Sequence, residues 1–383
     1  MRIGIDARAI LNPEKSAPSG VGNYVWHLIK NILDLDSENQ YVLFFDFKVR
    51  DRDVKRFSRP NVKIKFFPFS DYKKYMPGAY SEILGMATYI REKLDVLHVT
   101  SPIYRVPATY RGKVLTTFYD FAIYRVPELF PKLSAAKTRA LYSFMAKKSD
   151  HIIAVSEATQ KDAQEFLGYP AEKISMIHNG IDRRFFEPND FGREKLLEKY
   201  KIRGKYILFL GTLEPRKNLA RVIEAFSRFK KSGQAGADLQ LVVTGKRGWL
   251  AEEYFQQVAD LEIASDVIFT GYVSGDELKP LYTYSEFFVM PSLYEGFGQT
   301  IVEAMACGTP CLVSKVASIP EIVGDAAYFV DPNDTDGISA AMATLANDKN
   351  LRENLSEKGK RQAQKFSWEK CARETLEVYK KIV

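Results

Sequence analysis

The chain has 383 residues, ample for two hydrophobic cores, and its 46% apolar and 27% charged residues exclude a disordered protein. It enters a predicted strand at once and lacks the segments of a secretory signal, and it contains no apolar stretch near the ~20 residues that span a bilayer. It has only three cysteines, so we expect a cytoplasmic protein without a disulfide framework. The net charge of +7 is uneven, because residues 1–180 hold 27 basic and 19 acidic residues, whereas residues 181–383 hold 28 and 29.

Short apolar runs alternate with helical patterns through the first half of the chain. The predicted strands are residues 2–6, 41–45, 62–67, 96–99, 114–117 and 152–155. The predicted helices are residues 23–35, 80–93, 133–148 and 157–167. This alternation predicts an α/β domain in which helices cover both faces of a parallel sheet.

The second half repeats the same alternation. Its predicted strands are residues 206–210, 240–244, 267–270, 287–290, 311–314 and 327–330. The pattern breaks at residues 187–190, so we divide the chain into Rossmann-like domains at 1–185 and 186–365. The remaining segment, 366–383, contains a last predicted helix from about residue 368 to 382.

The most informative motif places Glu295 and Glu303 eight positions apart around a glycine-rich turn. The turn consists of Gly296, Phe297, Gly298, Gln299 and Thr300. A predicted strand ends just before it and a helix follows, which is where open α/β sheets bind ligands and where helix N–H groups hold phosphate. A carboxylate beside an anion site is costly unless it accepts hydroxyl hydrogens. The motif therefore favours a ligand with phosphates at one end and polyol groups around them, such as a nucleotide sugar.

Two further sets of residues lie at predicted strand-to-helix turns. Gly20 and Gly22 follow the first strand, where a missing Cβ lets the backbone approach a ligand closely. Arg216 and Lys217 precede a helix, although the helix dipole disfavours cations there, so we interpret them as neutralising a departing diphosphate. Another strand ends at Gly245 and Lys246 in a similar but less distinctive way.

Together these motifs resemble retaining glycosyltransferases of family 4. Residues 295–310 resemble the family's Glu-x7-Glu signature, and further matching segments occur in the family's order at residues 20–24, 155–157, 178–182, 211–218 and 271–273. The resemblance implies the GT-B fold, in which an amino-terminal acceptor domain and a carboxyl-terminal donor domain face across a cleft. It also implies that the last helix crosses back to the amino-terminal domain.

The resemblance also implies roles for individual residues. Arg216 and Lys217 would hold the diphosphate, Glu295 would contact the sugar hydroxyls, and Glu303 would accept from the ribose. Tyr272 and Val273 would lie beside the base. The family's retention of configuration is usually explained by front-face attack, in which the leaving diphosphate takes the acceptor proton and no protein base is required.

One position departs from the family pattern. Family members usually carry His-Asp where this chain has Tyr119 and Asp120, and that His contacts the donor sugar. A phenol donates or accepts one hydrogen bond but stays uncharged near neutrality. We therefore place Tyr119 and Asp120 with Glu295 among the candidate catalytic residues, and the substitution leaves open a catalytically silent binder of nucleotide sugars or an assembly partner.

We expect a retaining hexosyltransferase without a cofactor. GDP-mannose is the preferred donor, from overall likeness to bacterial mannosyltransferases of surface-polysaccharide assembly, and UDP- or dTDP-sugars are the alternative. The acceptor would be a glycan or a lipid-linked molecule. We interpret the pairs Asp34/Asp36 and Asp51/Asp53 as surface charges and predict no metal.

The excess positive charge of the first half is interleaved with aromatic residues between positions 51 and 148. Such a surface can meet anionic lipid headgroups or a lipid-pyrophosphate acceptor, or it can be a solvated basic face. Nucleic acid is not expected, because no recognised nucleic-acid motif is present. We therefore allow peripheral contact with the inner face of the cell membrane.

Overall fold

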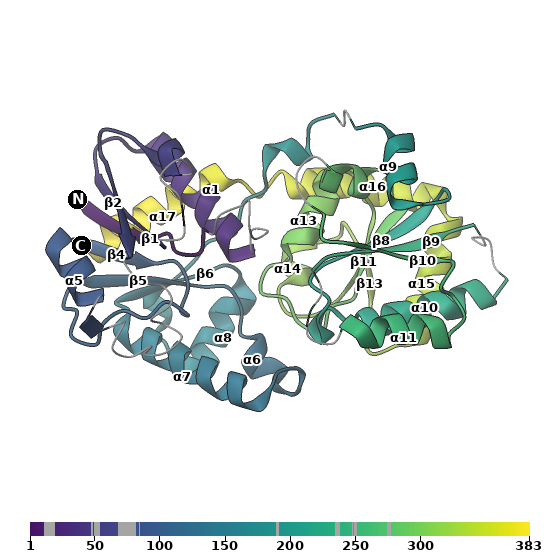
Figure 1. Cartoon of the computed structure of the whole chain (residues 1–383), viewed down its shortest axis with the longest axis horizontal. Coiled ribbons are helices and arrows are strands. Elements are labelled where there is room, and N and C mark those ends of the chain that lie inside the picture. Colours follow the sequence, from purple (N-terminus) through teal and green to yellow (C-terminus); the bar gives the residue numbers. More distant parts are fainter. Residues whose placement is uncertain are drawn as a thin grey trace. The chain divides into compact units, whose positions relative to one another are not determined.

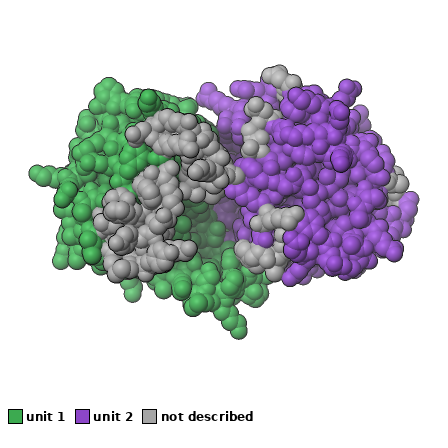
Figure 2. Space-filling model, in the orientation of Figure 1, with its two compact units in different colours: residues 1–180, 367–383 green, residues 181–366 purple. Residues whose placement is uncertain are grey.

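A computed structural model describes most of the chain as two compact units. The described residues are 1–10, 20–46, 49, 54–67, 82–83, 85–188, 191–233, 238–246, 248, 251–273 and 277–383. Unit 1 comprises Met1–Gly180 with Ser367–Val383, and unit 2 comprises Ile181–Phe366 (Figure 2). The sequence-based boundaries at 185/186 and 365/366 therefore differ from these divisions by five residues and by one residue.

Unit 1 contains a sheet in which every described strand pairing is parallel. Its strands are β1 (Arg2–Asp6), β2 (Gln40–Asp46), β3 (Val62–Phe67), β4 (Val96–Val99), β5 (Lys113–Phe118), β6 (His151–Ala154) and β7 (Ile174–Met176). The order across the sheet is β3-β2-β1-β4-β5-β6-β7. The central strands are buried along nearly their whole length, as expected when helices cover both faces of a parallel sheet.

The helices of unit 1 include one that comes from the far end of the chain. Those in the described part are α1 (Gly20–Leu35), α5 (Gly85–Tyr89), α6 (Ala122–Arg125), α7 (Lys132–Lys148), α8 (Glu157–Leu167) and α17 (Trp368–Ile382). The last helix, α17, packs along α1 (Figure 1). Tyr379 on α17 reaches the sheet, where its hydroxyl lies 2.8 Å from His98 Nδ1. The expected return of the carboxyl-terminal helix to the amino-terminal domain is thus confirmed.

Unit 2 is a second doubly wound domain with a parallel sheet. Its strands are β8 (Tyr206–Leu210), β9 (Gln240–Thr244), β10 (Val267–Gly271), β11 (Phe287–Met290), β12 (Cys311–Ser314) and β13 (Tyr328–Val330), in the order β10-β9-β8-β11-β12-β13. Its helices are α9 (Arg193–Tyr200), α10 (Leu219–Lys231), α11 (Ala251–Asp260), α12 (Leu278–Thr283), α13 (Gln299–Ala306), α14 (Ile319–Val323), α15 (Thr335–Asn347) and α16 (Lys349–Ala363). The strand order reverses between β8 and β11, so the turns after these two strands flank the place where such sheets bind ligands.

The structure differs from the predicted elements at several points in unit 1. Helix α1 begins at Gly20, not at residue 23, so Gly20 and Gly22 lie inside the helix and not in a turn before it. Strand β7 has only three residues, too short a run to stand out as a pattern, and was not predicted. The single helix predicted over residues 80–93 is instead α5 followed by a 3₁₀ turn at Ile90–Glu92, and residues 80, 81 and 84 lie outside the described part. Lys93 then ends the turn in the left-handed conformation, with φ of 49°.

None of the helices that the structure describes combines the length and the apolar character that crossing a membrane requires.

Candidate active site

The glycine-rich turn of unit 2 connects β11 to α13. Gly298 immediately precedes the helix in the left-handed conformation, with φ of 92°, which L side chains rarely adopt. It provides no side chain to cap the helix. The positive end of the α13 dipole lies at Gln299, which suits an anionic ligand.

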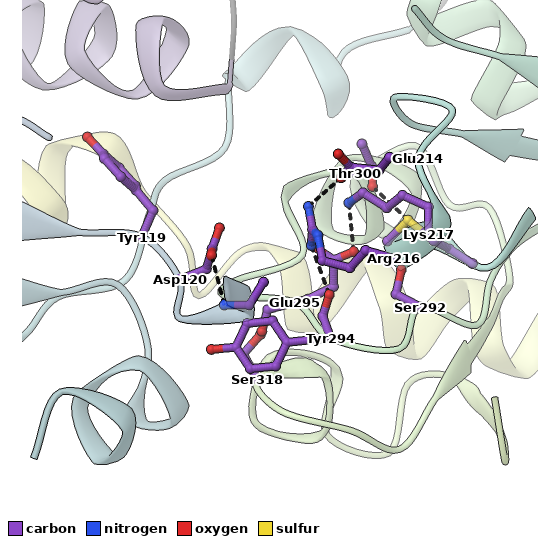
Figure 3. Close-up of polar contacts among 12 residues, drawn as sticks. Tyr119, Asp120, Glu214, Arg216, Lys217, Ser292, Tyr294, Glu295, Thr300 and Ser318 are labelled. Atoms are coloured by element: carbon purple, nitrogen blue, oxygen red, sulfur yellow. Dashed lines mark hydrogen bonds and ion pairs between the residues drawn. The ribbon is translucent and has the colours of Figure 1, made fainter. Parts of the chain in front are cut away.

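Glu295 lies in this turn and is buried against two cations. Its Oε1 lies 2.6 Å from Lys217 Nζ, and its Oε2 lies 3.1 Å from Arg216 Nη1 (Figure 3). All three side chains are at least 85% buried. The structure thus brings together the predicted sugar-binding carboxylate and the two predicted diphosphate-binding cations.

The two turns that carry these charges are also joined through their backbones. Arg216 belongs to a 3₁₀ turn, Pro215–Lys217, and its carbonyl accepts from Leu293 N at 2.9 Å. Its Nη1 also donates to Tyr294 O at 2.8 Å. Its Nη2 donates to Glu214 Oε1 at 2.7 Å. Arg216 therefore fixes the turn around Glu295, whereas Lys217 presents a single ammonium to the carboxylate.

The cations determine the protonation state of Glu295. Burial by itself raises the pKa of this carboxyl, but Lys217 and Arg216 outweigh burial and lower the pKa to about 2. Glu295 is accordingly ionised near neutrality and is a weak base. This favours a role in orienting a ligand and stabilising positive charge over a role in removing a proton.

Glu303 lies further along α13 in a different environment. It is 8% exposed, and its Oε2 accepts from the hydroxyl of Tyr282 at 3.0 Å. Burial raises its pKa to about 7, although Tyr282 and Arg184 act in the opposite direction. The surroundings therefore lower the pKa of Glu295 and raise the pKa of Glu303.

The residues predicted to lie beside the nucleotide base are also in unit 2. Tyr272 is 44% exposed, and Lys246 Nζ lies 5.1 Å from the centre of its ring. Val273 is buried. Gly245 has φ of 155°, and a Cβ there would lie 1.8 Å from Gly211 O, so the close approach of these two turns requires glycine.

The remaining residues of the turn make contacts inside unit 2. The Phe297 ring is buried and packs edge-on against Phe366 at 5.5 Å, so its side chain belongs to the core. Thr300 Oγ1 lies 3.4 Å from Met290 Sδ. Gly296 is buried, whereas Gln299 is partly exposed at the start of α13.

Four of the predicted site residues lie in unit 1. Gly20 and Gly22 form the first turn of α1, where Gly20 is exposed and Gly22 is buried. The Tyr119 hydroxyl donates to Thr100 O at 2.5 Å, so its hydrogen is already bound by the backbone of the same unit. Asp120 Oδ1 accepts from Ala122 N at 3.0 Å and helps to start α6.

No group of three or more His, Cys, Asp or Glu side chains within the described ranges is arranged to hold a metal ion. Asp36 accepts hydrogen bonds from Tyr41 and Asn39, and Asp34 lies 3.4 Å from Arg59. Asp51 and Asp53 lie outside the described residues.

Three residues of the site were not singled out from the sequence. Glu214 neutralises Arg216, and Tyr282 binds Glu303. Ser318 Oγ donates to Glu295 O at 2.9 Å and so holds the turn from the side of α14. Glu214 lies two residues before Arg216, a spacing that could have drawn attention to it. Tyr282 and Ser318 reach the motif from other elements, which no local pattern reveals.

Comparisons with known proteins identify the family of the chain. Residues 18–185 match the family Glycosyltransferase Family 4, and residues 192–362 match Glycosyl transferases group 1. O-antigen chain mannosyltransferase B of Escherichia coli is 30% identical over 96% of this chain and 97% of its own length. The chain belongs to glycosyltransferase family 4. Another similar protein, N-acetyl-alpha-D-glucosaminyl L-malate synthase of Bacillus anthracis, is 28% identical over 76% of this chain and 75% of its own.

Solved structures assign this family 4 glycosyltransferase to the GT-B fold. Anabaena HepE, crystallised with UDP and glucose, superposes with a TM-score of 0.77 at 18% identity over the whole of both chains. Sucrose-phosphate synthase from Thermosynechococcus elongatus gives a TM-score of 0.79 at 17% identity, covering 99% of this chain and 98% of its own. At these identities the likeness concerns the fold, and it confirms the predicted pair of Rossmann-like domains.

Proposed function

We propose that this glycosyltransferase is a retaining, metal-independent hexosyltransferase that uses GDP-mannose as its donor. The observation that carries the proposal is the buried cluster in which Lys217 and Arg216 converge on Glu295 beside the amino terminus of α13. It combines positive charge for a diphosphate with a carboxylate for sugar hydroxyls. The names of two relatives favour mannose: the Escherichia coli O-antigen enzyme, and an α-(1→4)-mannosyltransferase of Mycolicibacterium hassiacum that is 29% identical over 62% of this chain.

In the proposed reaction the bond between the anomeric carbon and the donor diphosphate breaks. An acceptor hydroxyl oxygen bonds to that carbon from the same face, and its proton passes to the departing diphosphate oxygen. Lys217 and Arg216 stabilise the negative charge that develops on the diphosphate, while Glu295 orients the sugar and stabilises its positive charge. No step requires Glu295 as a base, in agreement with its lowered pKa.

The donor is tested by measuring hydrolysis and transfer with a panel of purified nucleotide sugars in the presence of EDTA. We expect GDP-mannose to be turned over fastest, with a glycan or lipid-linked acceptor and with retained anomeric configuration. Preferential turnover of a UDP- or dTDP-sugar would contradict the choice of GDP-mannose. That alternative is supported by Anabaena HepE, a protein of similar fold that was crystallised with UDP-glucose.

A second part of the proposal concerns a surface of unit 1 that would bind the membrane. Six exposed residues of α7 share one helical face and combine cations with apolar groups. They are Lys132, Leu133, Ala136, Lys137, Ala140 and Lys147, and Leu133 is 69% exposed. We propose that this face rests on anionic lipid at the inner side of the cell membrane, because basic side chains and an exposed leucine suit a negatively charged interface.

Co-sedimentation with phosphatidylglycerol vesicles tests this surface. We expect binding that weakens as salt is added and that is lost when Lys132, Lys137 and Lys147 are changed to Glu. The same change at Lys349, Lys370 and Lys381, which are exposed elsewhere, is the matched control. Equal binding to neutral phosphatidylcholine, or equal loss in the control, would contradict the proposal.

A further inference from the structure

The hydroxyl of Tyr282 makes a buried hydrogen bond to the carboxyl group of Glu303. Tyr282 lies on α12 and is completely buried, and its oxygen is 3.0 Å from Glu303 Oε2. Burial and the neighbouring carboxylate raise the pKa of Tyr282, so its hydroxyl keeps its hydrogen at any physiological pH. It is therefore a permanent donor to one defined oxygen of Glu303.

Tyr282 is itself held from several directions. Its carbonyl accepts from Thr309 Oγ1 at 2.7 Å and from Ser285 Oγ at 2.8 Å. Its ring packs edge-on against Phe185 and Phe288, with centroid distances of 6.2 and 5.7 Å. A side chain restrained in this way can fix the direction of the group that it binds.

Glu303 has none of the ion pairs that neutralise Glu295. Within the described part of the chain, no cation lies within ion-pair distance of its carboxyl group, and Tyr282 provides its one side-chain hydrogen bond. Its Oε1 accepts no hydrogen bond from the described residues. A buried carboxyl group with a hydrogen bond to only one of its oxygens destabilises the fold. A ligand hydroxyl that donates to Oε1 would offset this cost.

We propose that Tyr282 is a positioning residue that holds Glu303 with Oε1 directed to the ribose hydroxyls of the donor. This inference rests on the proposed function, because it assumes a nucleoside diphosphate sugar in unit 2. Tyr282 does not touch the donor. It acts through Glu303, and it makes the site prefer nucleotides with 2′- and 3′-hydroxyl groups over their dideoxy forms.

The hydrogen bond from Tyr282 also lowers the pKa of Glu303. The groups that act on this carboxyl are Tyr282 and Arg184, which favour the ionised form, and Asp182, which opposes it. Tyr272 and Cys307 are two further titratable groups close enough to sense its charge. Without the Tyr282 hydroxyl the carboxylate would be harder to ionise, so ribose binding would require a higher pH.

The test is calorimetric titration with GDP and 2′,3′-dideoxy-GDP, with UDP and its 2′,3′-dideoxy form titrated alongside. We expect the wild type to bind the ribose form roughly tenfold more tightly at pH 8, the usual scale of a hydrogen bond to a charged group. Tyr282→Phe should lose most of this preference and shift the pH midpoint of binding upward. In a Glu303→Gln background, Tyr282→Phe should cause no further loss of the preference for ribose, because Tyr282 acts only through Glu303.

Tyr206→Phe is the matched control. Tyr206 is also completely buried in unit 2, and its hydroxyl donates to Leu281 O at 2.8 Å, next to Tyr282 but not to Glu303. It should keep the wild-type ribose preference and pH midpoint despite losing a buried hydrogen bond. A folded Tyr282→Phe protein with unchanged preference would overturn the inference and leave the proposed function intact. A wild type that binds neither GDP nor UDP would overturn both.

Discussion

Lys217 Nζ lies 2.6 Å from Glu295 Oε1 in unit 2, and both side chains are largely buried. The cation proposed to bind the diphosphate is therefore paired, before any ligand arrives, with the carboxylate proposed to bind the sugar. An entering diphosphate must compete with Glu295 for this ammonium group. Once it has done so, the freed carboxylate oxygen can accept a sugar hydroxyl. The ion pair thus couples the two ends of the donor site.

Glu295→Gln should separate binding from turnover. We expect transfer to fall by about 2–3 orders of magnitude, the usual scale of a lost electrostatic contact to the transition state. GDP affinity should be at least that of the wild type, because the amide no longer neutralises Lys217 and Arg216. Steady-state transfer kinetics and calorimetric titration of GDP measure the two effects.

Glu277→Gln provides the control for Glu295→Gln. Glu277 is also paired with a lysine, Lys199, in unit 2, but it lies outside the glycine-rich turn. Its substitution should leave both transfer and GDP affinity near their wild-type values. A loss of GDP affinity in Glu295→Gln as large as the loss of transfer would mean that Glu295 does not act on the sugar.

Lys217→Ala should weaken the diphosphate contact. We expect GDP to bind about 10- to 100-fold more weakly, in line with the loss of a hydrogen bond between charged groups, while guanosine, which has no phosphate, binds as before. Lys230→Ala, which removes a buried ammonium 3.5 Å from Asp266, is the control. If Lys217→Ala reduced guanosine and GDP binding equally, the lysine would have a structural role only.

Glu303 should make the stability of the protein fall as the pH rises from about 5 to 8. Its pKa of about 7 lies above the ordinary value of 4.5, so the folded protein retains a proton in this range that the unfolded chain has released. Glu303→Gln removes this effect. Its unfolding temperature relative to the wild type should therefore be higher at pH 8 than at pH 5, and an equal difference at both values would show that Glu303 titrates normally.

Tyr119→Phe should affect stability more than catalysis. The Tyr119 hydroxyl already donates to Thr100 O, so its removal leaves a carbonyl unsatisfied and should cost about 1 kcal/mol. Transfer should stay near the wild-type rate, because the hydroxyl hydrogen is not available to the donor sugar in this arrangement. A large fall in kcat with normal folding would instead support the catalytic role expected from the sequence.

Most of the fold could be predicted because its strands are continuous apolar runs and its helices have clear boundaries. Strands β8, β9, β11 and β12 and the last helix, α17, have the predicted bounds. Strand β7 was missed because three residues do not make a pattern. The single helix expected over residues 80–93 was wrong because, in the described part, α5 ends at Tyr89 and a 3₁₀ turn follows at Ile90–Glu92.

The candidate site was only partly accessible from the sequence. Glu295, Arg216 and Lys217 lie in turns after β8 and β11. This placement follows from the doubly wound topology, because the carboxyl ends of neighbouring parallel strands lie at the same edge of the sheet. The pairing of their charges does not follow from topology, because it depends on side-chain directions. The contacts of Tyr282 and Ser318 with the motif also depend on side-chain directions, because both residues come from other elements of unit 2.

The central claim is that the two glutamates of the turn bind an activated sugar at its hexose and its ribose. A crystal structure with GDP-mannose bound tests it most directly. We expect the diphosphate at Lys217 and the start of α13, the mannose hydroxyls at Glu295, and the ribose at Glu303 Oε1. A donor held elsewhere, with the Glu295–Lys217 ion pair intact and Glu303 without a ribose contact, would contradict the claim.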